Sequence, residues 1–187
     1  MKHNNHGFTL LELIVSFAIL AVLVLAVMGF MSAGTGTYRS VSTETTLQYN
    51  SQLTLAQMQS YLLNCNGGAC FDTGTETLYL LDKDDAGGYT LLSFQQKDGK
   101  LYYNTQPVTV GGDGKTLSYY TTEDAASYQP DFMADGVSAF GVTFETTYDA
   151  ETKMTYAVRA AASLSLENSG RAFTGQQETA LRNPVVY

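Results

Sequence analysis

The feature that most constrains this chain is an uncharged, mostly apolar run of 21 residues, residues 13–33, close to the N-terminus. A helix rises about 1.5 Å per residue, so this run would span roughly 31 Å, which matches the hydrocarbon core of a bilayer. A secretory signal peptide, a plain single-pass anchor and a more specialised membrane helix all contain such a run. A signal peptide fits less well, because its apolar core is shorter and Met31 stands where its cleavage site needs a small residue.

Glu12 directly precedes the apolar run, and a plain anchor does not explain it. A carboxylate at the centre of a membrane helix costs about 2–3 kcal/mol, and less near the helix end, so it usually has a partner. If the chain were cut between Gly7 and Phe8, the new amino group would lie four residues, or one helical turn, before Glu12. In a bundle of such helices, Glu12 of one copy could pair with the Phe8 amine of the next, and each charge would offset the other's desolvation. We therefore expect Glu12 to set the axial stagger between copies.

The segment "GFTLLELIV", preceded by the short basic leader "MKHNNH" and followed by the apolar helix, resembles the prepilin signal of type IV pilins and type II secretion pseudopilins. This resemblance implies that prepilin peptidase cuts after Gly7 and methylates the amino group of Phe8. It also implies that Glu12 is the glutamate that the family uses in assembly. The motif covers only about the first 33 residues, and a generic anchor with a chance glutamate remains the alternative.

One residue departs from the family's pattern. Many major pilins carry a helix-breaking proline midway along this helix, whereas this chain has Gly29 there, followed by Gly34 and Gly36. Glycine costs about 1 kcal/mol inside a helix but keeps the backbone hydrogen bond that proline removes. Local melting of the helix during assembly is therefore permitted by this sequence but not required.

A second helical pattern follows these glycines. Apolar and small side chains recur at steps of three and four residues, which places them on one face of a helix: Leu47, Ser51, Leu55, Met58 and Leu62. We predict that residues 35–64 continue the helix as an amphipathic half that packs on a globular head. The predicted helix ends near Asn64, where "NCNGGAC" supplies glycine stop signals.

The rest of the chain has the alternation typical of β-strands. Asp98 and Gly99 lie between the strand-like runs "YTLLSFQQ" and "KLYYN" and predict a hairpin. Residues 111–136 are interpreted as loops, with only "TLSYY" strand-like. The other predicted strands are residues 77–81, 140–144, 155–166 and 179–182. The longest of them has one predicted buried face: Tyr156, Val158, Ala160, Ala162, Leu164 and Leu166.

One long helix followed by an antiparallel β-sheet predicts an α+β, pilin-like fold. The expected organisation is a leader peptide, a transmembrane and assembly helix, an amphipathic helix and a β-rich head, at residues 1–7, 8–34, 35–64 and 65–187. The stretches "DGVSAFGVTFE" and "ALRNP" are also similar to parts of the J-type pseudopilins and W-type minor pilins. These stretches and the length of the chain favour a minor subunit.

Cys65 and Cys70 are the two cysteines of the chain, and they stand in "CNGGAC" with four residues between them. A tight loop through the two glycines could bring the sulfurs together, and exported chains meet oxidising surroundings. We therefore expect a disulfide, with a pair of reduced cysteines in a turn as the alternative. A metal site would need more ligands, and the sequence supplies none beside this pair.

Composition and motifs argue against several classes of function. The chain has 10 lysines and arginines against 18 aspartates and glutamates, a net charge of −8, so direct nucleic-acid binding is not expected. Both histidines, His3 and His6, lie in the predicted leader, which leaves no convergent acid, base or nucleophile for an enzyme. Residues 82–88 lack the ligand spacing of a calcium loop, although some pseudopilins bind calcium, and residues 111–115 lack the spacing of a phosphate loop. We expect neither a cofactor nor a metal.

The sequence therefore predicts a non-enzymatic structural subunit of a type IV pilus or pseudopilus, assembled through its N-terminal helix. The resemblance implies three kinds of partner: other pilin or pseudopilin subunits, prepilin peptidase, and the assembly platform proteins of the membrane. It also implies a cytoplasmic-membrane location before assembly and a cell-surface filament afterwards, with the head extracellular or periplasmic. A surface adhesin or uptake-tip subunit and a generic single-pass anchored domain are the alternatives. The residues do not distinguish a motility pilus from a secretion or a competence pseudopilus.

Overall fold

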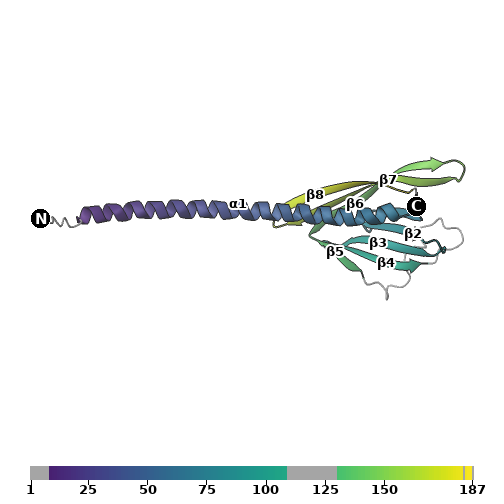
Figure 1. Ribbon diagram of the computed structural model, residues 1–187, viewed down its shortest axis with the longest axis horizontal. Helices are drawn as coiled ribbons and strands as arrows, with labels where there is room; N and C mark the ends of the chain where they lie inside the picture. Colours follow the sequence, from purple (N-terminus) through teal and green to yellow (C-terminus); the bar gives the residue numbers. More distant parts are fainter. Residues whose placement is uncertain (1–8, 109–129, 183, 187) are drawn as a thin grey trace, which may run out of the picture. The chain divides into compact units, whose positions relative to one another are not determined.

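A computed structural model describes residues 9–108, 130–182 and 184–186 of the chain. It divides into two compact units, Met1–Ser42 and Thr43–Tyr187. One long helix, α1 (Leu10–Asn64), begins in the first unit and ends in the second, and a β-sheet follows it (Figure 1). The predicted α+β class and the predicted helix end at Asn64 are both confirmed.

The first unit consists of the N-terminal part of α1. The helix runs without interruption through Gly29, Gly34 and Gly36, and a side chain placed at any of the three would meet no other atom within 4 Å. These glycines are therefore not required by a turn or by a close contact in this structure. Each one simply lowers the intrinsic stability of the helix, because glycine loses more backbone freedom than other residues on folding.

In the second unit, α1 buries one face against the sheet. Its buried residues are Leu47, Ser51, Thr54, Leu55, Met58 and Leu62, which include every residue of the predicted face. The spacing of three and four residues places them in a single stripe along the helix. The amphipathic pattern in this part of the chain is thereby confirmed.

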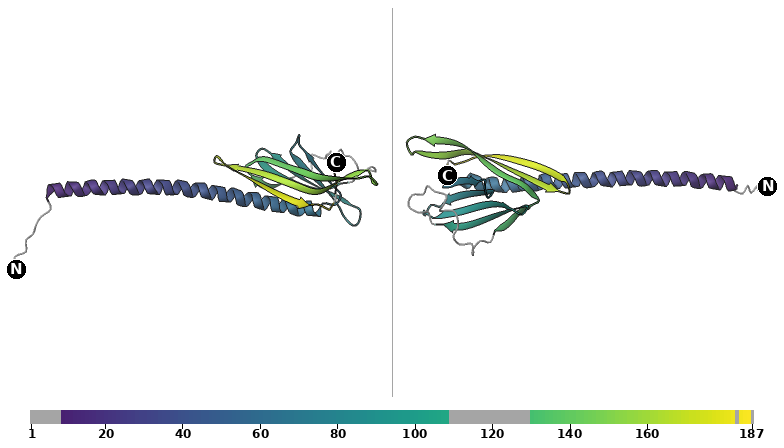
Figure 2. Two further views of the ribbon diagram at one scale, coloured as in Figure 1. Left: turned by 90° about the horizontal axis from the view of Figure 1, so that it is seen from above. Right: turned by 180° about the vertical axis from the view of Figure 1, so that it is seen from behind.

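The sheet has nine strands in the order β5-β4-β3-β2-β1-β9-β7-β6, with β8 also paired to β7. Neighbouring strands are antiparallel except β1 and β9, which run parallel. The sheet is curled, and the C-terminal part of α1 lies along one face of it, with the β2–β5 portion to one side of the helix axis and the β6–β8 portion to the other (Figures 1 and 2). The strands are β1 (Gly68–Asp72), β2 (Thr77–Lys83), β3 (Tyr89–Lys97), β4 (Lys100–Val108), β5 (Asp131–Asp135), β6 (Val137–Asp149), β7 (Met154–Asn168), β8 (Arg171–Ala180) and β9 (Val185–Val186).

Three hairpin turns show how the local sequence sets the strand pairing. Asp98 and Gly99 have φ angles of 52° and 72° and join β3 to β4, as the Asp-Gly pair predicts. Two longer turns share an Asp-x-x-Thr pattern. Asp72 accepts hydrogen bonds from the Gly74 amide and the Thr75 hydroxyl, both at 2.8 Å, between β1 and β2. The same pattern recurs between β6 and β7, where Asp149 is the acceptor.

The long strand β7 departs from the predicted alternation at its N-terminal end. The predicted buried face is correct over the C-terminal half of the strand. Nearer the turn, Ala157 is fully buried, whereas Tyr156 and Val158 are only half-buried. The cause is a β-bulge: Glu145 of β6 pairs with Arg159, but the next residue of β6 pairs with Ala157, so Val158 is an extra residue. One extra residue moves every later side chain to the opposite face.

Other strand boundaries also differ from the prediction. Residues 131–135, inside the stretch expected to be loops, form β5, while "TLSYY" lies outside the described residues. The predicted strand at 179–182 is wrong at its end, because β8 stops at Ala180. β1 begins at Gly68, within the glycines that were expected only to stop the helix. β9 has two residues, too few to give an alternating pattern.

Asn66 connects the end of α1 to the sheet. Its side-chain amide donates to the Lys83 carbonyl at 3.0 Å, and its side-chain oxygen accepts from the Lys83 amide at 2.7 Å. The Asn66 side chain thus makes the two hydrogen bonds that a residue of a neighbouring strand would make. These bonds satisfy the amide and the carbonyl of Lys83 at the end of β2. The Gly67 amide continues this line with a bond to the Leu81 carbonyl.

Candidate functional site

Thr9 and Glu12 form the start of α1. The Glu12 amide donates to the Thr9 hydroxyl at 3.3 Å, and the Leu13 amide donates to the Thr9 carbonyl at 3.2 Å. Thr9 is therefore the N-cap residue, and Glu12 occupies the third helical position after it. Thr-x-x-Glu before an apolar run is the capping-box pattern. Our sequence reasoning missed this role of Thr9, although the spacing of the two residues could have revealed it.

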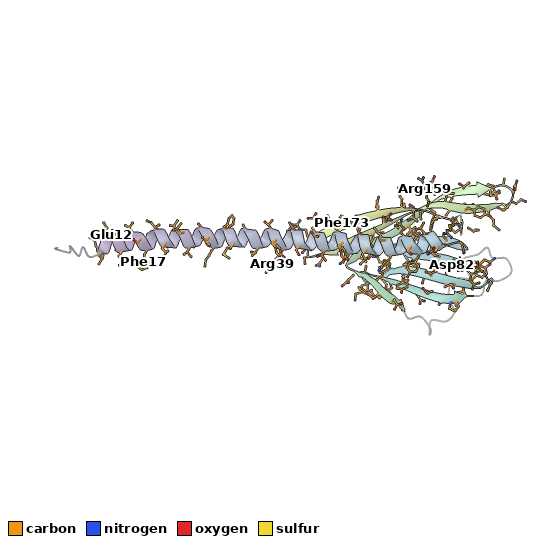
Figure 3. All side chains as sticks on the ribbon, viewed as in Figure 1. Glu12, Phe17, Arg39, Asp82, Arg159 and Phe173 are labelled. Carbon is orange, nitrogen blue, oxygen red and sulfur yellow. The ribbon has the colours of Figure 1, made fainter. Side chains whose placement is uncertain are left out.

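The first turn of α1 is also the place where a helix favours negative charge. The amides at a helix N-terminus carry a partial positive charge equal to about half an elementary charge, so a carboxylate there is stabilised. Glu12 is the acidic residue of this turn, and it is exposed (Figure 3). Its expected partner, the amine of Phe8, lies outside the described residues, as does Gly7. Within the described ranges, the one ion pair joins Arg159 and Glu145.

Hydroxyl groups along the N-terminal part of α1 are satisfied by the helix itself. Ser16 donates to the Glu12 carbonyl at 2.7 Å, Thr35 to the Met31 carbonyl at 3.0 Å and Thr37 to the Ala33 carbonyl at 3.1 Å. A hydroxyl that bonds to its own helix needs no water, so it can enter an apolar environment at small cost.

The apolar side chains of this part of α1 are exposed and project from the helix on all sides (Figure 3). They are Leu10, Leu11, Leu13, Ile14, Val15, Phe17, Ile19, Leu20, Val22, Leu23, Val24, Leu25, Val27, Met28, Phe30 and Met31. Among the described residues, α1 is the one helix long and apolar enough to span a membrane, and none of its apolar window is buried. A helix that is apolar all round is stable when lipid or other helices surround it. The candidate site is therefore an apolar surface that can pack against lipid or against other apolar helices.

In this structure the two cysteines are free thiols, so the expected disulfide is not shown and stays a prediction. The Cys65 thiol is buried and donates to the Gly68 carbonyl at 3.1 Å. Cys70 pairs with Tyr79 in the β1–β2 ladder, so the glycines support an extended strand rather than the tight loop that a disulfide requires. Burial raises the pKa of Cys65 to about 11 and also raises the pKa of Cys70, to which the nearby Asp72 charge adds.

The acidic stretch at residues 82–88 begins in the last two residues of β2, and residues 84–88 form the turn to β3. The Asp84 carboxylate accepts a hydrogen bond from the Gly88 amide at 2.7 Å, so this aspartate closes the turn. In the part of the chain that the structure describes, no group of three or more histidines, cysteines or acids could hold a metal ion. His3, His6 and residues 111–115 lie outside that part.

Comparison with known families decides what the N-terminal segment is. Residues 2–28 match a family described as "Prokaryotic N-terminal methylation motif". The chain carries a prokaryotic N-terminal methylation motif. This motif is typical of the prepilin signals of type IV pilins and pseudopilins, which confirms the resemblance seen in the sequence. A comparison of the chain with curated proteins found no match.

The methylation motif includes the capped first turn and most of the apolar surface described above. It supports a pilin-like substrate of prepilin peptidase, and the apolar helix that follows is consistent with membrane anchoring. The motif also implies interaction with pilus subunits in general. It ends well before the head, so the match itself carries no information about the sheet.

Proposed function

We propose that this chain is a structural subunit, and specifically a minor one, of a type IV pilus or pseudopilus. One observation carries the proposal: the methylation motif includes the N-terminal part of α1, whose apolar side chains are exposed on every side. Such a surface is stable in a bilayer before assembly and in a bundle of like helices afterwards. The head, after residue 64, would then face outward, in the extracellular or periplasmic space.

The proposed assembly begins with cleavage after Gly7 by prepilin peptidase and methylation of Phe8. The new N-terminus lies four residues before Glu12, within one turn. In the bundle, the amine of one subunit pairs with Glu12 of the next, and only one axial stagger neutralises both charges. Residues 8–34 would form the anchor, and residues 35–64 would connect it to the head. Partners are the other subunits, the peptidase and the assembly platform of the membrane.

The processing step is tested by mass spectrometry of the protein isolated from cells that contain prepilin peptidase. We expect the mature chain to begin at Phe8 and to carry one methyl group on its amine. In Gly7→Arg the band on a gel should stay at the size of the uncleaved chain. Isolation of a chain that still begins at Met1 from peptidase-containing cells would contradict the proposal.

The assembly step is tested by comparing Glu12→Gln with Thr9→Val. Both variants should be cleaved. Glu12→Gln should be recovered from sheared filaments at a several-fold lower level, because glutamine keeps the shape of the glutamate side chain but loses the charge that pairs with the amine of the next subunit. Thr9→Val removes the capping oxygen at nearly constant volume, so it weakens the helix start by about 1 kcal/mol and should assemble almost normally. Equal losses in the two variants would show that Glu12 acts through the cap and not through pairing.

The abundance of the chain in sheared filaments tests the proposed class of subunit. A minor subunit should be present at a small fraction of the filament mass, and a major subunit would form most of it. Quantitative mass spectrometry of the sheared fraction measures this ratio directly. A dominant share for this chain would refute the minor role and leave the structural role intact.

A further inference from the structure

A groove of about 380 Å³ lies between the C-terminal part of α1 and the edge of the sheet formed by β4 and β5. On the helix side it is lined by Leu53, Thr54, Gln57, Ser60 and Tyr61, and on the sheet side by Tyr103, Phe132 and Met133. Its walls therefore combine apolar side chains with aromatic rings. Grooves with this composition and with a few convergent polar groups are typical binding sites.

Two tyrosine rings line this groove, one from each side, and a third aromatic ring packs behind them. The ring centroids of Tyr61 and Tyr103 are 6.0 Å apart, and each ring packs on Phe94, at 5.5 Å and 6.2 Å. Phe94 is fully buried, so it fixes the two tyrosines from behind. The tyrosines themselves are only partly buried, and their hydroxyls are the polar ends of this wall.

A β-bulge places a carboxylate beside these hydroxyls. Leu101 pairs with Ala134, but the next residue of β4, Tyr102, pairs with Phe132, so Met133 is an extra residue in β5. Regular alternation from the buried Ala134 would have put Phe132 on the helix side and Asp131 on the outer side. The bulge reverses this arrangement, and Asp131 pairs with Tyr103.

The exchanged orientations of Asp131 and Phe132 do not by themselves favour folding. The bulge leaves the large apolar side chain of Phe132 59% exposed, although that ring still meets Tyr102 in an edge-to-face pair at 6.4 Å. It also brings Asp131 next to Tyr103, whose pKa is raised by the neighbouring Tyr61 and then by the Asp131 charge. Departures of this kind from the local folding rules are expected mainly where a protein binds something.

We propose that this groove is a docking site for an arginine side chain on a basic segment of a partner protein. The guanidinium presents several N–H donors in a plane. The Tyr61 and Tyr103 hydroxyls line the groove, and Asp131, the cross-strand neighbour of Tyr103, adds a carboxylate acceptor beside them. The apolar stem of the arginine would lie along Leu53 and Met133. Within the described ranges, no cation forms an ion pair with Asp131.

The net charge of the chain indicates which kind of partner the groove would bind. The chain carries a net charge of −8, so a second copy approaches against repulsion, whereas a basic segment is attracted to the groove. The inference is independent of the proposed function, because it uses no residue before Leu53. The groove would bind the same chemistry whether or not the chain enters a filament.

The test uses the full-length chain in micelles of an uncharged detergent, with ¹³C-labelled methionine methyl groups. Met133 lines the groove, whereas Met58 is fully buried and Met154 lies on β7. A shift of the Met133 signal alone would therefore report binding in the groove, and a shift of all three signals would report a change in the fold. Titration with the peptide acetyl-Gly-Arg-Gly-amide should shift the Met133 signal to saturation, in the millimolar range. The peptide acetyl-Gly-Glu-Gly-amide should leave it in place.

Two variants on the same strand make the test specific. Asp131→Asn should weaken binding of the arginine peptide by roughly tenfold, because it removes the charged acceptor. Asp135→Asn is the matched control and should bind as the parent does. Its carboxylate oxygen accepts only from the Gly136 amide, which an asparagine oxygen can also do. An unchanged Met58 signal shows that each variant is folded.

Three results would count against the inference. Absence of any saturable Met133 shift with the arginine peptide, in a chain whose Met58 signal is native, would show that the groove does not bind this group. A Met133 shift that follows protein concentration without peptide would show that a second copy occupies the groove, against the choice of a basic partner. Equal binding by Asp131→Asn and the parent would remove the role of the carboxylate.

Discussion

Ser51 of α1 lies directly against Gly175 of β8. A Cβ atom built on Gly175 would collide with the Ser51 hydroxyl and would come within 2.9 Å of the Leu55 side chain. The helix can approach the sheet at this point only because residue 175 has no side chain. This contact fixes the depth at which the amphipathic half of α1 sits on the head.

Gly175→Ala should therefore lower the free energy of unfolding of the head. Overpacking a well-packed contact costs about 1–3 kcal/mol, and both helix and strand backbones resist movement here. Denaturant unfolding followed by circular dichroism measures the change. The neighbouring exposed substitution Gln176→Ala should change stability by less than about 0.5 kcal/mol. Equal effects of the two substitutions would contradict the close contact.

Ser51→Ala should raise the stability of the head or leave it unchanged. The Ser51 hydroxyl is fully buried and has no hydrogen-bond partner among the residues that the structure describes, which is an unfavourable state for a polar group. Alanine removes this group and has a better helix propensity, so we expect a gain of up to about 1 kcal/mol. Ser60→Ala, at an exposed position of the same helix, isolates the propensity effect. A clear loss of stability in Ser51→Ala would indicate that an ordered water bonds the hydroxyl.

The sequence predicted the elements whose signals are local. The 3.6-residue period identified the buried face of α1, and Asp98-Gly99 identified the β3–β4 turn, because both depend on neighbouring residues alone. The bulges at Val158 and Met133 depend on which strands pair across the sheet, so no local pattern reveals them. β9, with two residues, is defined only by its neighbours β1 and β7.

The residues of the candidate site also divide into those that a local sequence signal reveals and those that it does not. The methylation motif is a contiguous string, so the sequence alone revealed it, and the roles of Gly7, Phe8 and Glu12 stay predictions. The expected disulfide is not shown: the prediction treated "CNGGAC" as a loop, whereas pairing with β2 places Gly68 in a strand. The groove between α1 and β5 brings together residues about 70 positions apart, which no spacing rule detects.

Cys65 should react with iodoacetamide much more slowly than Cys70 in the native chain. Cys65 is buried, its thiol donates to backbone carbonyls and its pKa is raised to about 11, so little thiolate is available near pH 8. Cys70 is less buried, and its pKa is also raised. Peptide mass spectrometry after timed alkylation measures both rates. Recovery of a bond between the two sulfurs, or equal rates, would contradict the structure.

The Cys65 thiol also predicts a pH dependence of stability. Its folded pKa of about 11 lies above the ordinary value of 9.0, so the native state holds this proton more tightly than the unfolded state. The stabilisation is complete below the ordinary value and is lost as the pH rises through the folded value. Stability should therefore fall between pH 9 and 11 more steeply in the parent than in Cys65→Ala. Identical slopes would be inconsistent with a buried thiol.

Asp72 and Asp149 predict the opposite dependence at acidic pH. The pKa of Asp72 is lowered by the Thr75 hydroxyl and the Gly74 amide, and the pKa of Asp149 by the Glu151 amide and the Thr152 hydroxyl. Their stabilisation is present above the ordinary pKa and is lost as the pH falls through the lowered values, below about pH 4. Thermal unfolding of Asp72→Ala/Asp149→Ala should vary less with pH in that window than unfolding of the parent. A steeper acid loss in the double variant would refute this assignment.

The two hydrogen bonds between the Asn66 side chain and Lys83 have a mechanical consequence. They join the segment just after α1 to the end of β2, in parallel with the covalent chain. A pull along α1 that has separated its buried face from the sheet would next load these two bonds, which share the tension. An alanine at this position would remove both of them and leave the Gly67–Leu81 hydrogen bond as the next connection to the sheet.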